Sequence, residues 1–184
     1  MTAATLLTPL KSAGYALAVP PRTGNWQIDP GVSYLELRLR ELHRTSLLEA
    51  PIIHGQAHLT DTASTSWIQL QFGAAYGRRG SSRATAWMRS AGLDSRERPA
   101  RYDSRMLLAS PRGWRMCGQL HGESLDAMLI ADAHVLNVLT RSDGRDAMVM
   151  TAYGCINRTR SGDLSQALVR SRVAVRIHAY LVHD

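Results

Sequence analysis

Apolar and polar residues alternate with a period of two through much of this chain. In residues 34–40 three leucines alternate with charged side chains, and residues 67–72 repeat the pattern. Successive side chains of a β-strand point to opposite faces, so this alternation predicts strands with one apolar and one polar face. Further strands are predicted at residues 114–120, 125–133, 145–153 and 172–182, with a hairpin turn at residues 121–124. Many antiparallel strands favour an all-β barrel or sandwich.

One segment follows a helical period instead. Its apolar residues recur at i, i+3, i+4 and i+7 and share one stripe of a helix: Ala84, Trp87, Met88 and Ala91. Serines just upstream can cap the start of this helix, and Gly92 can end it. A second short helix is predicted at residues 163–168.

The length of the chain suits a single domain. Its 184 residues are 45% hydrophobic and 20% charged, which is enough to bury a core without metals or disulfides. No apolar stretch approaches the ~20 residues that a membrane span needs. Residues 1–22 lack a secretory pattern, because Pro9 and Lys11 interrupt their short apolar run. We therefore expect a partly disordered extension at residues 1–22, a barrel domain at residues 23–184 and a cytoplasmic location.

The chain is basic, with 22 Lys+Arg against 15 Asp+Glu and a formal net charge of +7. No run of four or more basic residues occurs, and aromatic residues make up only 6%. We interpret the charge as spread over the surface for solubility and expect no DNA partner. The two cysteines, Cys117 and Cys155, have no C-x-x-C spacing, which predicts free thiols rather than a zinc or redox motif.

Motifs of catalysis are scarce. The sequence contains neither a P-loop nor a G-x-G-x-x-G fingerprint, and GESLD at residues 122–126 matches only half of a nucleophile elbow. His54 and His58 are four residues apart, with His43 and Asp61 nearby. A metal site needs a third ligand and an oriented second shell, so we interpret these histidines as loop or surface residues. The sequence predicts a protein that is not an enzyme.

Five short motifs, in this order, resemble those of the YceI-like family. They are GNWQIDP (residues 24–30) followed by Ser33, MRSAGLD (88–94), RPARY (98–102), GQLHG (118–122), and INR (156–158) followed by Gly162. Together they extend from about Asn25 to Tyr180. The chain resembles a divergent member, because it carries a single phenylalanine, Phe72, where the family is rich in phenylalanine.

The resemblance implies an all-β, lipocalin-like, eight-stranded antiparallel β-barrel with one short helix packed at an end. It also implies a non-catalytic protein that sequesters or transports a polyisoprenoid, such as a quinone or prenyl phosphate, in an apolar tunnel. No other cofactor is expected, and a homodimer is expected by analogy. The apolar strand faces and the predicted helix supply candidate lining residues: Leu35, Leu37, Leu39, Ile68, Leu70, Phe72, Met88, Met128, Ile130, Met148 and Met150.

Two other functions stay open at this point. The first is a small isomerase or cyclase, in which His134, Tyr153 or His178 moves a proton on a polyene or quinone held in the barrel. It requires one of these side chains to point into an apolar cavity. The second is an interaction module that uses a basic outer face to bind RNA or anionic lipid.

Overall fold

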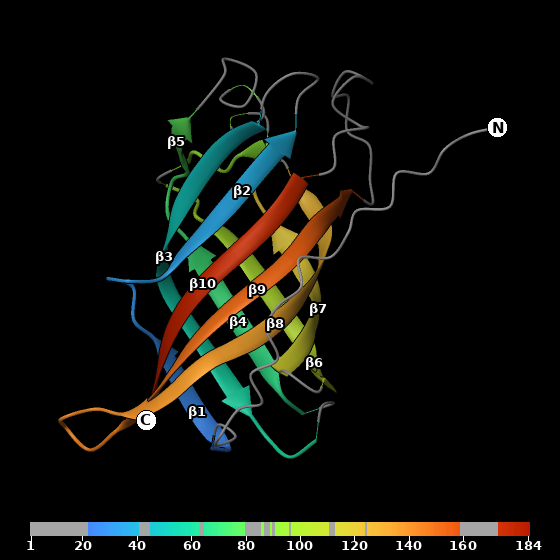
Figure 1. Ribbon diagram of the computed structural model, residues 1–184. Helices are drawn as coiled ribbons and strands as arrows, with labels where there is room; N and C mark the ends of the chain where they lie inside the picture. The colour runs from blue at the N-terminus through green and yellow to red at the C-terminus, as the bar shows by residue number, and fades with distance from the viewer. Residues whose placement is uncertain are drawn as a thin grey trace.

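In the computed structural model, ten strands form one sheet whose neighbouring strands are all antiparallel, and eight of them close into a barrel (Figure 1). The structure describes residues 22–40, 45–62, 65–79, 86, 89, 91–95, 97–110, 113–123, 125–158 and 173–184. The strands are β1 (Gly24–Ile28), β2 (Tyr34–Arg40), β3 (Thr45–Leu59), β4 (Trp67–Phe72), β5 (Tyr76–Arg79), β6 (Ala100–Ser110), β7 (Gly113–His121), β8 (Asp126–Thr140), β9 (Asp146–Arg158) and β10 (Val173–His183).

The barrel runs in the order β2-β3-β4-β6-β7-β8-β9-β10 and returns from β10 to β2. Strands β8, β9 and β10 form the near wall in Figure 1, and β4 is seen behind them. Closure gives each of these eight strands a neighbour on both sides, which removes the free edges that an open sheet would have. The predicted all-β, eight-stranded antiparallel barrel is confirmed, with β1 and β5 as extra strands.

Strands β1 and β2 share one place in the wall, between β3 and β10. Residues 29–33 connect the two strands without being part of either, and Ser33 hydrogen-bonds to both neighbouring strands at this interruption. The Ser33 hydroxyl accepts a hydrogen bond from the Tyr180 amide at 2.9 Å, and its carbonyl accepts one from the Ile52 amide at 3.0 Å. The Asp29 amide donates to the Tyr180 carbonyl at 2.8 Å. These bonds continue the ladder across the interruption, because buried backbone groups need partners.

The inward side chains of the barrel form one apolar cluster to which β1–β4 and β6–β10 contribute. Large residues dominate the wall made by β1 to β4, among them Trp26, Ile52 and Phe72, all at most 1% exposed. The alternation that predicted strands therefore also separates the two faces correctly. On β10, for example, Val175 and Ile177 are buried while Arg176 between them faces outward.

Sequence reasoning missed β3, which with β8 is one of the two longest strands of the wall. This strand contains Pro51 and Gly55, which favour turns, and a β-bulge between Ile52 and His54 that interrupts its alternation. Two successive residues, Ile53 and His54, consequently face outward. The interpretation of His54 and His58 as loop or surface residues is half right: both lie on the outer face of this strand, His54 exposed and His58 partly exposed, and neither lies in a loop. Strand β6 was also missed; it carries a bulge between Ser104 and Met106.

The predicted helices lie mostly outside the described residues. Met88 and residues 163–168 are among those outside, so their structure stays a prediction. At the predicted end of the first helix, Gly92 has a φ of 67°, and its amide donates to the Arg89 carbonyl at 3.1 Å. This left-handed conformation is the one that glycine adopts after the last turn of a helix.

Candidate functional site

The barrel interior holds most of the residues predicted to line a tunnel. Each of the following alternates with an outward neighbour and is at most 4% exposed: Leu35, Leu37, Leu39, Ile68, Leu70, Phe72, Met148 and Met150. They come from β2, β4 and β9, three elements spread around the closed wall. Their inward placement is confirmed, whereas their contact with a ligand stays a prediction.

Two predicted lining residues on β8 face the wrong way. Met128 and Ile130 are each 38% exposed on the outer face, while Ala127, Leu129 and Ala131 point inward and are buried. Both phases of this strand are rich in apolar residues, so periodicity alone does not identify its inner face. We assigned the bulkier side chains to the interior, and that assignment is wrong. A shift of one residue moves a whole strand face from core to solvent.

The β8–β9 wall is lined by unusually small side chains. Two adjacent register pairs, Ala131 with Gly154 and Ala133 with Ala152, form what we term the small-residue patch. In the eight-strand order, β8 and β9 lie four places from β3 and β4, so this patch faces their large aliphatic residues across the interior. A Cβ added at Gly154 would lie 2.9 Å from the Ala131 Cβ, so this glycine allows the two strands to pack closely.

Two polar side chains enter this apolar interior from β6. The Tyr102 hydroxyl donates a long hydrogen bond of 3.4 Å to the Leu129 carbonyl, and its ring covers the backbone of Gly118. The Ser104 hydroxyl lies 3.0 Å from the Met106 carbonyl and 2.9 Å from the Cys117 carbonyl. Burial raises the pKa of Tyr102 well above its usual range. Tyr102 therefore stays neutral in the folded barrel.

The three candidate proton-transfer residues lie on the outer face of the barrel. His134, Tyr153 and His178 alternate with the inward residues of β8, β9 and β10. His178 stacks on Tyr34 with a centroid distance of 4.5 Å, and the Arg176 guanidinium lies 5.1 Å from the Tyr153 ring centroid. None of the three candidates points into the apolar interior. The isomerase or cyclase hypothesis required one of these three side chains to point into an apolar cavity, and in this structure none of them does.

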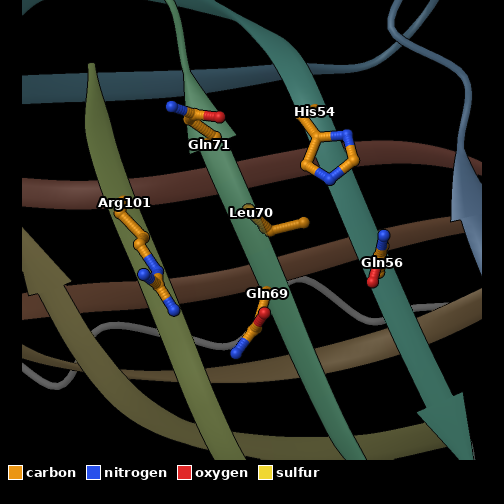
Figure 2. Close-up of a pocket in the computed structure, with 6 residues that line it drawn as sticks. All are labelled: His54, Gln56, Gln69, Leu70, Gln71 and Arg101. Carbon is orange, nitrogen blue, oxygen red and sulfur yellow. The ribbon is translucent and has the colours of Figure 1, made fainter. Parts of the chain in front are cut away.

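A concave polar site lies on the outer face of β3, β4 and β6, which sequence reasoning did not identify (Figure 2). Its volume is about 230 Å³. It is lined by His54, Gln56, Gln69, Leu70, Gln71 and Arg101. The alternating glutamines of β4 were a usable sequence signal, but their partners on β3 were hidden by the missed strand.

No protein-family model matches the chain, and no curated protein matches it. The barrel that the YceI-like resemblance implied is present, while membership of that family stays a prediction. Within the described ranges, no three His, Cys, Asp or Glu side chains are grouped as metal ligands. The described part of the chain also has no helix that is long and apolar enough to cross a membrane.

Proposed function

We propose that this barrel is a non-catalytic binding protein for a long apolar lipid of the polyisoprenoid type, like the YceI-like proteins that its sequence resembles. The observation that carries the proposal is the chemistry of the inner wall. Eight closed strands present mostly aliphatic, methionine and alanine side chains and one phenylalanine inward. Buried polar side chains among them are Tyr102 and Ser104 from β6 and Ser46 from β3. Barrels of about eight strands hold either a packed core or one small ligand.

The apolar wall suits a ligand that is bound by burial of surface rather than by hydrogen bonds. An isoprenoid chain gains about 25 cal/mol for each Å² of apolar surface removed from water. The thioethers of Met148 and Met150 adapt to irregular apolar shapes, which favours a branched chain. A buried charge would oppose such a ligand. Among the described inward positions, Asp, Glu, Lys, Arg or His side chains occur only at one end of the barrel, where Asp146 begins β9 and His183 ends β10 beside Trp26.

The small-residue patch supports a specific position for the ligand. Ala131, Ala133, Ala152 and Gly154 leave more room beside the β8–β9 wall than larger aliphatic residues would. We propose that the lipid chain runs along this patch and against the aliphatic side chains of β3 and β4. If the protein binds lipid there, a larger side chain introduced at the patch should occupy the space of the lipid and prevent its binding.

Native mass spectrometry of the full chain tests the proposal. Purified protein incubated with a polyprenol and with a ubiquinone should gain the mass of one lipid molecule. The Ala133→Phe variant should lose this uptake, because the new ring occupies the lipid's place. The control is Leu136→Phe on the same strand, where the native leucine is 59% exposed, and it should bind lipid normally.

The free energy of unfolding of the Ala133→Phe variant shows whether the barrel interior is open or already filled by side chains. A phenyl ring placed in a filled core costs about 1–3 kcal/mol, whereas a ring placed in open space costs little. Loss of lipid uptake with an unchanged free energy of unfolding would support the proposal. The proposal would be refuted if the mass spectrum of the wild-type protein showed neither a co-purified lipid nor uptake of an added one.

A further inference from the structure

The outer site on β3, β4 and β6 is built as a regular grid of polar side chains. Strand pairing places His54, Gln71 and Arg101 in one row. The next row contains Gln56, Gln69 and Asp103. Figure 2 shows side chains from these three neighbouring strands around one shallow hollow.

The bulge in β3 shapes this grid. It turns both Ile53 and His54 outward, and it precedes Gly55, which faces the interior opposite Leu70. A Cβ at Gly55 would lie 2.7 Å from the Ile28 Cδ1 atom and 3.2 Å from the Gln69 carbonyl oxygen, so the glycine lets the inner side chains pack closely on this backbone. Bulges that re-aim side chains are over-represented beside binding sites.

Four of the side chains that line the hollow have unused hydrogen-bonding groups. Among the described residues, the side chains of His54, Gln56, Gln69 and Gln71 have no hydrogen-bond partner. Each glutamine amide offers two N–H donors and one carbonyl acceptor, and the imidazole adds a further ring nitrogen. Three amides and an imidazole therefore line one hollow with both donors and acceptors available.

The charge of the hollow is balanced. The Arg101 guanidinium pairs with the Asp103 carboxylate, with 2.7 Å between Nε and Oδ2. This pair leaves no spare positive charge for a phosphate, and the polar lining does not suit an apolar ligand. Neutral hydroxyl groups both donate and accept hydrogen bonds, as the amides do.

The size of the hollow limits the ligand. Its volume of about 230 Å³ is below the ~300–1,000 Å³ of pockets that enclose drug-sized molecules. One pleat further along the same face, Trp67 stacks on His58 with a centroid distance of 6.1 Å, and His58 is held by the Asn25 side chain at 2.6 Å. This ordered aromatic pair offers a flat apolar surface beside the hollow.

We propose that this outer hollow is a carbohydrate-binding site for a single neutral sugar ring or the end of a longer glycan. The amides of Gln56, Gln69 and Gln71 bind ring hydroxyls, and Arg101 and His54 border the ring. The site lies on the opposite side of the wall from the lipid, so it is independent of the proposed lipid-binding function.

Saturation-transfer NMR with the full chain tests the site against glucose, galactose, mannose and N-acetylglucosamine at millimolar concentration. At least one sugar should receive saturation. The Gln69→Ala/Gln71→Ala double variant should bind that sugar about tenfold more weakly, because it loses about two hydrogen bonds. The single variant Gln56→Glu, which keeps the side-chain size but removes the amide donor, should also weaken binding.

The control is Asn137→Ala, which removes an exposed side-chain amide on β8, on the far side of the barrel from β3 and β4. It should bind sugar as the wild-type protein does, and far-ultraviolet circular dichroism should show all variants folded. The proposal is overturned if no sugar receives saturation, if the β4 double variant binds as tightly as the control, or if inorganic phosphate displaces the sugar. Lipid uptake by the double variant should be unchanged, which separates this test from that of the barrel interior.

Discussion

Tyr102 places a phenol inside an otherwise apolar barrel. Its side chain is fully buried, and burial raises the pKa of the hydroxyl well above its usual range. The folded protein therefore holds this proton more tightly than the unfolded chain, in which a tyrosine titrates near ~10. The stability contributed by Tyr102 is complete below that pH and is lost as the pH rises above it.

We predict that the free energy of unfolding falls by about 1 kcal/mol between about pH 9 and about pH 11 because of Tyr102 alone. Urea unfolding of the wild-type protein and of Tyr102→Phe measures this difference. The variant should lose less stability over the interval than the wild type. Equal losses in the two proteins would show that the buried phenol does not control alkaline unfolding.

His178 illustrates a different environment on the outer face. Partial burial and the charge of Arg176 lower the pKa of His178, while Glu36 and Glu49 oppose this shift. Folding thus favours the neutral imidazole, and this contribution to stability is present above the ordinary histidine pKa and is lost as the pH falls through it. Arg176→Gln should raise the pKa of His178 in an NMR titration of its ring protons.

Arg115→Gln is the control for this titration, because Arg115 lies three strands from Arg176 on the same face and pairs with Asp132 at 2.7 Å. The Arg115→Gln variant should leave the titration midpoint of the His178 ring unchanged. A midpoint that moves equally in both variants would mean that general surface charge, and not Arg176, sets the pKa.

At the scale of elements, a short motif at the junction of β1 and β2 holds the neighbouring strands together by hydrogen bonds. Ser33 is 3% exposed and bonds to both flanking strands, β3 and β10, through its carbonyl and hydroxyl. The residues that carried the family resemblance at this point, Asp29 and Ser33, thus have a role in closing the barrel. Ser33 contributes its hydroxyl, whereas Asp29 contributes its backbone amide, and the Asp29 side chain accepts a hydrogen bond from the Gly31 amide at 2.9 Å.

We predict that Ser33→Ala lowers the free energy of unfolding by about 1–3 kcal/mol, because it leaves the Tyr180 amide buried without its acceptor. Thermal and urea unfolding measure the loss. Ser142→Ala in the exposed turn between β8 and β9 is the control and should change stability little. A loss of similar size in both variants would contradict the bridging role of Ser33.

Strands with clean alternation were predicted well, and strands with bulges were not. Residues 34–40 and 67–72 match β2 and β4, since each has one apolar and one polar face. Strand β3 was hidden by Pro51, Gly55 and a bulge, whose effects depend on pairing with distant strands. The outer hollow needs β3 and β4 side by side, so the alternating glutamines of β4 were not enough to reveal it without the missed strand.

At the scale of the whole molecule, the barrel has two chemically distinct sides. Its inner wall is apolar, with large side chains on β3 and β4 facing the small-residue patch on β8 and β9. Its outer wall carries paired charges, the polar hollow and a partly exposed apolar strip that includes Met128 and Ile130. One closed sheet can therefore present a lipid site inside and a separate polar site outside.

The most direct measurement for the central proposal is an experimental electron-density map of the protein crystallised with a polyprenol. We predict continuous tubular density inside the barrel, in contact with Ala131, Ala133 and Ala152 on one side and with the aliphatic residues of β4 on the other. A map in which the protein's own side chains fill the interior, with no density for the lipid, would contradict the account.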